Sequence, residues 1–169
     1  MSIKSVIFGF SGTMLTKKEE EFFKSERPAG FILFARNCQN KEQIKRLTGS
    51  LRELVDYNIK IFIDQEGGRV CRIRPPEFRP CPAANFFSEI AEAQSMEAAL
   101  EQLYDNYFNI TKDLLELGID INCAPVADLR YDYADNIIGD RSFGSDGAQV
   151  TECCKIVINA ISKAGGVGI

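Results

Sequence analysis

The sequence predicts an α/β protein built around a parallel sheet. Its 169 residues alternate short β-branched or aromatic runs with longer segments of helical periodicity. Repeated βα units of this kind give parallel strands joined by right-handed crossovers. The pattern is β-α-β-α-β-α-β-α-β, which is four βα units and the start of a fifth strand. It fits either an open doubly wound sheet or part of a (β/α)8 barrel, because a whole barrel needs about 200 residues or more.

The first half of the chain contains three predicted strands separated by two predicted helices. The strands are expected over residues 3–10, 30–35 and 60–64. The middle run, GFILFA, is apolar throughout, which is typical of a strand buried on both faces. Thr16 precedes a short polar helix that ends before Pro28, and Asn40 is placed to cap the next helix, which Asn58 ends. The apolar positions of that second helix form one stripe: Ile44, Leu47, Leu51, Leu54 and Val55.

The second half contains two predicted helices, a strand between them and a strand that begins at the last residues. The longer helix has apolar residues in steps of four and three: Met96, Leu100, Leu103, Tyr107, Ile110, Leu114 and Leu117. Gly118 ends it, and residues 119–126 follow as a strand. The last helix carries its apolar stripe on Val150, Cys153, Val157, Ile161 and Ala164. Two irregular segments, 65–82 and 127–146, complete the chain, and segments this long in a compact domain are usually functional or mobile.

The composition excludes several classes of protein and of site. A net charge of −4 gives no electrostatic attraction to nucleic acid or anionic membranes, so neither is expected as a partner. The chain has no histidine, which excludes a Ser-His-Asp triad, a Cys-His pair and a His-ligated zinc within it. Its six cysteines contain no C-x-x-C motif and are interpreted as small buried hydrophobes in a reducing cytosol. With no signal-peptide layout and no long apolar run, the chain is expected to be soluble and cytoplasmic.

Polar side chains follow the predicted strands at their carboxyl ends, where both architectures bind ligands. They are Arg36, Asn37, Asp64, Glu66, Arg69, Arg72, Asp128 and Arg141. Carboxylates and guanidiniums both form charge-assisted hydrogen bonds with hydroxyls, so this set suits a polyhydroxylated ligand. Gly67 and Gly68 allow either close approach of the backbone to a ligand or a sharp bend. No phosphate-binding glycine motif follows any strand.

Each of these residues also has a structural interpretation. Asp64 and Glu66 could form a catalytic pair, since glycosidase carboxylates lie about 5 to 9.5 Å apart, but this sequence spacing is common by chance. For Asp128, a role as a turn or cap residue is preferred over a role as a ligand contact. Arg69 and Arg141 fit structural ion pairs as well as substrate contacts. The phenylalanines are interpreted as core residues and not as a stacking surface: Phe31, Phe34, Phe62, Phe86 and Phe87.

The segment IDQEGGRVCRIR, residues 63–74, resembles glycoside hydrolase family 3, in its bacterial β-N-acetylhexosaminidase type. Three further segments agree in order and spacing: GFILFARN (30–37), INCAPVADLR (121–130) and IGDRSFGSD (138–146). The resemblance implies a TIM-type barrel that removes terminal β-linked N-acetylglucosamine with retention of configuration, in peptidoglycan recycling. It also implies that Asp64, Arg72 and Arg141 bind sugar hydroxyls, and that no metal or organic cofactor is needed. Residues 1–169 would be the N-terminal part of the catalytic domain.

One departure from the family pattern concerns the catalytic groups. In the family, a K-H-F-P-G-H-G-type segment after the fifth strand supplies the acid-base histidine, and an aspartate nucleophile follows later. This chain ends at AGGVGI and has no histidine, so we expect a half barrel with part of the sugar subsite, no catalytic residue and no activity alone. A complementary C-terminal half or self-association would then complete it. The alternatives are a non-catalytic sugar-binding remnant and an unrelated α/β module that binds a flavin or nucleotide.

Overall fold

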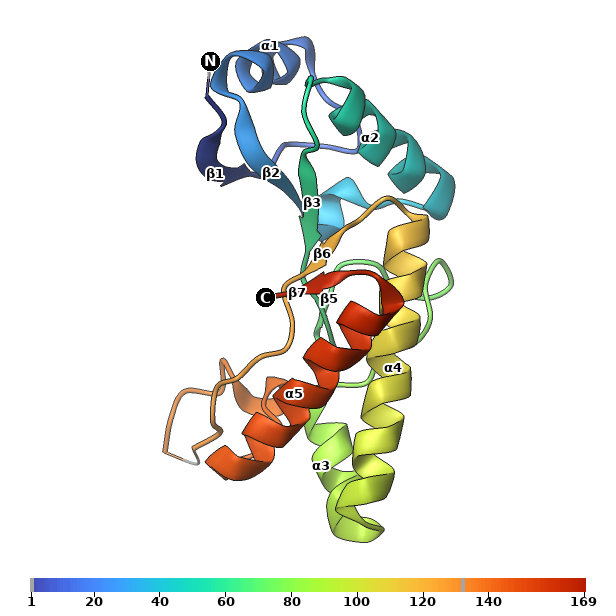
Figure 1. Ribbon diagram of the computed structural model, residues 1–169, viewed down its shortest axis with the longest axis vertical. Coiled ribbons are helices and arrows are strands. Elements are labelled where there is room, and N and C mark those ends of the chain that lie inside the picture. Colours follow the sequence, from blue (N-terminus) through green and yellow to red (C-terminus); the bar gives the residue numbers. More distant parts are fainter. Residues whose placement is uncertain (1, 132) are drawn as a thin grey trace.

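The computed structural model describes residues 2–131 and 133–169 and contains a five-stranded parallel sheet. The strands are β1 (Lys4–Phe8), β2 (Pro28–Leu33), β3 (Lys60–Ile63), β6 (Ile121–Asn122) and β7 (Val167–Gly168). They lie in the order β1-β2-β3-β6-β7, so every crossover moves one strand further in the same direction (Figure 1). A doubly wound sheet reverses its strand order part-way, and these strands do not. The fold is therefore a partial (β/α)8 barrel of four βα units and a fifth strand, as predicted.

The two faces of the sheet are covered differently. Phe31 and Leu33 of β2 are fully buried and pack in one core with side chains of the helices. Ile32, which points to the opposite face, is only half-buried. Because side chains alternate between the two faces along a strand, the sheet has an outer face covered by helices and an inner face. Within the described residues the inner face is only partly covered. On that inner face the ring of Phe62 lies over Gly30, where an added Cβ would come within 2.5 Å of it.

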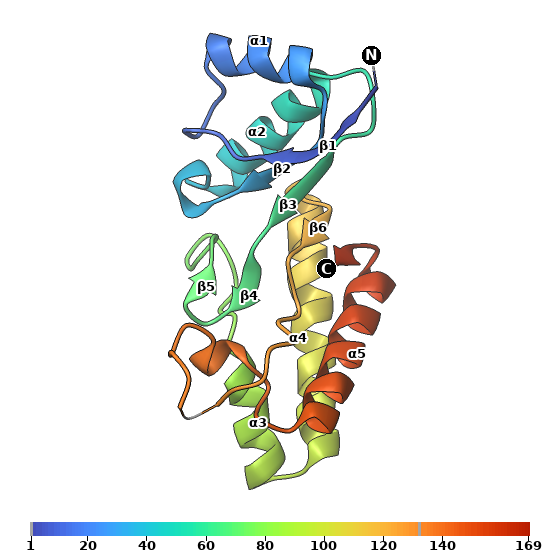
Figure 2. The ribbon, with the colours of Figure 1, turned by 90° about the vertical axis from the view of Figure 1, so that its left-hand side faces the viewer.

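The N-terminal helices begin at side-chain caps that the sequence predicts. Helix α1 (Lys17–Glu26) begins at Thr16, which forms a capping box with Glu19. Helix α2 (Lys41–Glu53) begins at Asn40, whose side chain accepts a hydrogen bond from the backbone N–H of Gln43. The helix ends at Glu53, earlier than predicted. Both helices pack on β2 and β3 at one end of the molecule (Figure 2).

The other helices form a second core, shared by α3 (Ala84–Ala93), α4 (Met96–Glu116) and α5 (Gly147–Ala164). The bounds of α4 agree with its apolar period, and Gly118 beyond it adopts a left-handed φ of +75°. Helix α3 was not predicted. It begins at Ala83, which has no side-chain capping hydrogen bond, so the usual sequence signal for a helix start is missing. Phe87 is buried in this core, whereas Phe86 is exposed, contrary to its interpretation as a core residue.

Two further segments differ from their predictions. The strand expected over 119–126 is limited to β6, because the chain leaves the sheet after Cys123, whose N–H donates to the Ile63 carbonyl at 2.8 Å. The segment 65–82, expected to be irregular, contains an antiparallel hairpin of β4 (Gln65–Gly67) and β5 (Val70–Cys71). The six cysteines are free and lie buried or half-buried. Among the described residues, no helix has the length and apolar character needed to cross a bilayer.

Candidate functional site

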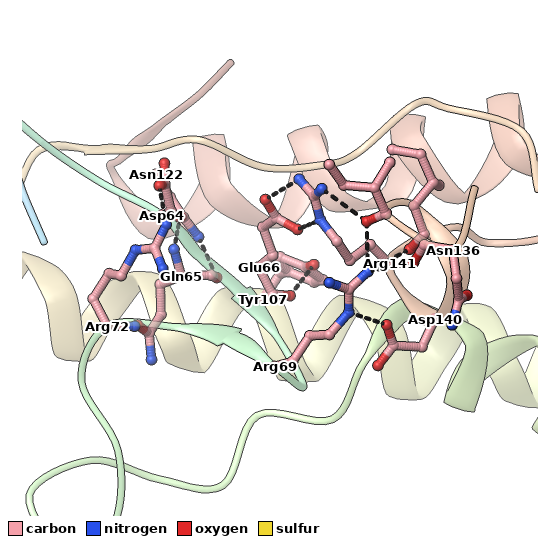
Figure 3. A network of polar contacts seen from close by, with 12 residues as sticks. Asp64, Gln65, Glu66, Arg69, Arg72, Tyr107, Asn122, Asn136, Asp140 and Arg141 are labelled. Carbon is pink, nitrogen blue, oxygen red and sulfur yellow. Dashed lines mark hydrogen bonds and ion pairs between the residues drawn. The ribbon is translucent and has the colours of Figure 1, made fainter. Parts of the chain in front are cut away.

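The candidate site lies at the carboxyl end of β3, where Asp64 follows the strand and the β4–β5 hairpin begins. Asp64 and Glu66 each pair with a guanidinium, while Gln65 between them is fully buried (Figure 3). This alternation is what an extended backbone produces, since successive side chains point to opposite faces. The Asp64 carboxylate therefore lies on the partly exposed rim, and the Glu66 carboxylate lies on the same side but is nearly buried. The Gln65 amide belongs to the core beneath them.

Gln65 connects the hairpin to the sheet through a closed set of hydrogen bonds. Its backbone N–H donates to Asn122 Oδ1, and its carbonyl accepts from Asn122 Nδ2, both at 2.9 Å. Its side-chain Oε1 accepts from the N–H groups of Arg72, at 2.9 Å, and Ile73, at 3.2 Å. Its Nε2 donates to the Ile73 carbonyl at 2.8 Å. A buried polar group with this many partners has one preferred geometry. The backbone that carries Asp64 and Arg72, on either side of Gln65 in the hairpin, is therefore held in a fixed position.

Asp64 and Arg72 form the first ion pair of the rim. Arg72 Nη2 lies 2.6 Å from Asp64 Oδ2, and the two side chains are 26% and 21% exposed. The Arg72 guanidinium also lies over the ring of Phe34, 5.7 Å from its centre. Beside the pair, burial raises the pKa of the Cys123 thiol to about 12, and the negative charge of Asp64 adds to the effect. Cys123 is therefore a neutral thiol at physiological pH, and the polar character of this part of the rim comes from the ion pair.

Glu66 and Arg141 form the second ion pair, which joins residues 75 positions apart. Arg141 Nε and Nη2 donate to the two carboxylate oxygens of Glu66 at 2.7 and 2.8 Å, a bidentate geometry. The Glu66 side chain is only 10% exposed, and its hydrogen bonds raise the pKa of Arg141, so the guanidinium stays charged. Arg141 Nη1 donates to the Ile137 carbonyl at 3.3 Å. With these three bonds, two of about five guanidinium N–H groups have no partner among the described residues.

The hairpin turn requires its two glycines. Gly67 has a φ of +119°, and a Cβ there would lie 2.0 Å from the carbonyl oxygen of Pro82. Gly68 has a φ of +56° and donates its N–H to the Cys81 carbonyl at 2.8 Å. Of the two interpretations of this pair, the sharp bend is the one observed, with the protein's own loop packed against it.

The structure brings Asp64, Arg72 and Arg141, the three predicted binding residues, to one edge of the sheet (Figure 3). Asp64 and Arg72 contact each other, whereas Arg141 contacts Glu66. Both rim carboxylates are thus neutralised by guanidiniums, which disfavours Asp64 and Glu66 as a catalytic acid-base pair. Arg69 is also ion-paired, to Asp140 at 2.8 Å.

The other rim candidates have mainly structural contacts. Asn37 is fully buried and donates to the carbonyls of Phe10 and Gly12, at 3.2 and 2.7 Å. Arg36 donates to the same Phe10 carbonyl at 2.9 Å. The Asp128 main-chain carbonyl accepts from the Ser142 hydroxyl at 2.6 Å. Asp128 lies in irregular backbone, so its interpretation as a turn or cap residue stays a prediction.

Two residues of the site were not predicted from the sequence. Asn122 holds Gln65, and the Tyr107 hydroxyl donates to the Glu66 carbonyl at 2.7 Å. Asn122 carried a signal, since it is a lone amide within an apolar strand. Tyr107 carried none, because its position in the apolar stripe of α4 also suits an ordinary core residue.

Comparison with known proteins identifies the family. Residues 5–168 match the family model described as the glycosyl hydrolase family 3 N terminal domain. The chain belongs to glycosyl hydrolase family 3. The β-hexosaminidase of Haemophilus influenzae is 33% identical over 163 residues, which cover 96% of this chain and 45% of that protein. The β-hexosaminidase of Aromatoleum aromaticum is 32% identical over 160 residues.

Solved structures of family 3 proteins agree in fold over nearly the whole chain. The crystal structure of NagZ from Neisseria gonorrhoeae in complex with N-trifluoroacetyl-D-glucosamine superposes with a TM-score of 0.93 at 30% identity. The match covers 98% of this chain and 49% of that one. A family 3 β-N-acetylglucosaminidase from Paenibacillus shares the fold with a TM-score of 0.86. The chain thus spans about half the length of the curated relatives it matches.

Proposed function

We propose that residues 1–169 are the N-terminal part of a family 3 catalytic domain and hold part of its sugar-binding site. Asp64, Arg72 and Arg141 bind hydroxyls of a terminal β-linked N-acetylglucosamine, and the substrate class is the muropeptides of peptidoglycan recycling. The observation that carries this proposal is the pair of arginine–carboxylate contacts on one rim, supported from below by the Gln65–Asn122 network. The β-hexosaminidase relatives and the amino-sugar complex of gonococcal NagZ support the choice of sugar.

The rim suits hydroxyl recognition more than bond cleavage. A carboxylate accepts and a guanidinium donates, so an adjacent pair offers complementary partners to neighbouring hydroxyls of a sugar ring. Retaining hydrolysis needs a carboxylate nucleophile and a separate acid-base group. Asp64 and Glu66 are each bound to an arginine. The 169-residue polypeptide therefore binds the sugar without hydrolysing it, and in the full reaction the nucleophile and the acid-base come from a further polypeptide segment.

The partner of this chain is, in our proposal, a complementary barrel half, with a second copy as the alternative. A groove of about 740 Å³ runs along α5, and the residues lining it include Leu129, Val150 and Ile158. Beside it, Val167 and Ile169 are 50% and 60% exposed at the β7 edge. An apolar groove next to a strand edge that pairs with no other described residues suits a parallel strand followed by an amphipathic helix. The cytoplasm, where muropeptides are recycled, is the proposed location of this protein.

A titration of N-acetylglucosamine followed by NMR tests the proposed function on the polypeptide of residues 1–169. We expect saturable shifts at Asp64 and Arg72, and affinity reduced about tenfold in Arg72→Ala, the loss of one hydrogen bond to a charged group. Arg79→Ala is the matched control, because Arg79 forms a similar pair with Asp113 at 2.6 Å, elsewhere on the surface. Equal loss in both variants, or no saturable shift, would reject the proposed site.

A second assay tests the absence of activity. The same preparation should release no product from a chromogenic β-N-acetylglucosaminide. Turnover that survives rigorous purification would contradict this and would require a catalytic role for Asp64, Glu66 or Asp128.

A further inference from the structure

Arg69 reaches from the β4–β5 turn across to the segment that precedes Arg141 (Figure 3). Its Nε donates to Asp140 Oδ1 at 2.8 Å. Its Nη2 donates to the carbonyl of Asn136 at 3.0 Å and also lies within hydrogen-bond distance of the next two carbonyls, those of Ile137 and Ile138. One side chain thus holds a carboxylate and three consecutive carbonyls.

Two of the three carbonyls that Arg69 contacts also accept hydrogen bonds from Arg141. The Ile138 carbonyl accepts from the backbone N–H of Arg141 at 2.9 Å and begins the short 3-10 turn Gly139–Arg141. The Ile137 carbonyl accepts from Arg141 Nη1 at 3.3 Å. Both ends of Arg141, its backbone and its guanidinium, are therefore fixed to groups that Arg69 also contacts.

The segment has local hydrogen bonds, from the Ile137 N–H to Asp135 Oδ1 and from the Ala134 N–H to the Tyr131 carbonyl, but little apolar anchoring. Ile137 is 63% exposed and Tyr133 is 87% exposed, so apolar burial contributes little to its conformation. The backbone from residue 133 to residue 138 has no helix or strand. Polar contacts must supply most of the order here, and among the described residues those of Arg69 connect the segment directly to the β4–β5 hairpin.

We propose that Arg69 is a positioning residue for sugar recognition: it sets the place of Arg141 on the rim by holding the carbonyls of residues 136–138. This inference rests on the proposed function of Arg141. Arg69 donates from two separate nitrogens, Nε to Asp140 and Nη2 to the carbonyls, whereas lysine carries its three N–H donors on one nitrogen and cannot occupy both positions. Arg69→Lys keeps the positive charge but removes the simultaneous contact with Asp140 and the carbonyls of residues 136–138. It therefore distinguishes an effect of geometry from an effect of charge alone.

The test compares Arg69→Lys with Arg79→Lys in the 169-residue polypeptide, using two readouts. The first is the NMR signal of the Arg141 Nε–H group, identified by its loss in Arg141→Lys. We expect this signal to broaden or move in Arg69→Lys and to stay in place in Arg79→Lys. The second is affinity for N-acetylglucosamine, which should fall about fivefold in Arg69→Lys and remain unchanged in Arg79→Lys.

A double variant distinguishes positioning from an independent effect. In an Arg141→Ala background, Arg69→Lys should cause no further loss of affinity, because the residue acts through Arg141. Additive losses, or an unmoved Arg141 signal, would overturn the inference. If the unmutated polypeptide binds no N-acetylglucosamine, the proposed function fails, and the Arg141 signal still decides whether Arg69 positions that guanidinium.

Discussion

At the scale of single residues, the rim depends on charges that are only partly accessible to water. Glu66 is nearly buried, and a buried carboxylate is costly unless a cation and further hydrogen bonds compensate it. Arg141 supplies both through its bidentate contact. Asp64 and Arg72 are more exposed, so their pair contributes less to stability and remains available to a ligand.

Arg141→Ala should therefore destabilise the protein by roughly 3 kcal/mol, because it leaves the Glu66 carboxylate buried without a partner. Urea denaturation measures this directly. Arg79→Ala breaks an exposed pair and should cost about 1 kcal/mol or less. A loss in Arg141→Ala no larger than in Arg79→Ala would show that Glu66 does not depend on its arginine.

At the scale of elements, the capping box of α1 should make stability depend on pH. Burial alone would raise the pKa of Glu19, but hydrogen bonds from Thr16 and Ser11 lower it to about 2, from an unfolded value of 4.5. A lowered folded-state pKa gives stability that is present above pH 4.5 and lost as the pH falls toward 2. The unmutated protein should therefore have a higher Tm than Glu19→Gln above pH 4.5, and this Tm difference should decrease as the pH falls from 4.5 to 2.

Glu20→Gln, one residue further along α1, is the control for this effect. Its Tm difference from the unmutated protein should change less than that of Glu19→Gln, because the capping hydrogen bonds from Thr16 and Ser11 go to Glu19. A difference for Glu19→Gln that does not change with pH would mean that the capping hydrogen bonds do not prefer the ionised carboxylate.

Elements with strong local signals were predictable, and those that depend on distant contacts were not. Helix α4 was predictable because its apolar period continues over six turns. Helix α3 carried only the weak spacing of Ala84, Phe87 and Ile90, with no side-chain cap. The β4–β5 hairpin is held by contacts of Gln65 with a strand far along the chain, which no local pattern encodes.

The same distinction applies to the site. Parallel strands end at one edge, so the sequence order alone could place Asp64, Arg72 and Arg141 on one rim. Which carboxylate pairs with which arginine depends on the path of the loop that carries Arg141. The sequence did not specify this path, and the bond between Glu66 and Arg141 was not foreseen.

The Gln65–Asn122 contact is the link between the hairpin and the sheet. Asn122→Ala should destabilise the protein by about 2–3 kcal/mol, because it removes two buried hydrogen bonds and leaves the Gln65 groups without partners. Thermal unfolding measures the loss, and Asn109→Ala on the exposed part of α4 is the control, with an expected effect within about 0.5 kcal/mol. Equal effects would contradict the role given to this network.

At the scale of the whole molecule, the sheet has two outer strands, β1 and β7, each paired on one side only among the described residues. Both edges expose apolar side chains, including Ile3 just before β1, Ile7 on β1 and Val167 on β7. Unpaired edges with apolar residues favour association with another chain. We therefore expect the 169-residue polypeptide to self-associate or aggregate as its concentration rises.

Sedimentation over a range of concentrations checks this expectation. Val167→Lys should shift the equilibrium toward the monomer, because a charge at a strand edge opposes pairing. A monodisperse monomer at every concentration, with cooperative melting, would mean that the open edges are tolerated without a partner.

The location of the bound sugar decides the proposed site, and a crystal structure of the 169-residue polypeptide with N-acetylglucosamine tests it most directly. We predict ring hydroxyls within about 3.2 Å of the Asp64 carboxylate and the Arg72 guanidinium, a hydrogen-bond distance, with Arg141 contacting the same ring. A sugar bound elsewhere, or a rim that stays empty at saturating concentration, would contradict the proposed site.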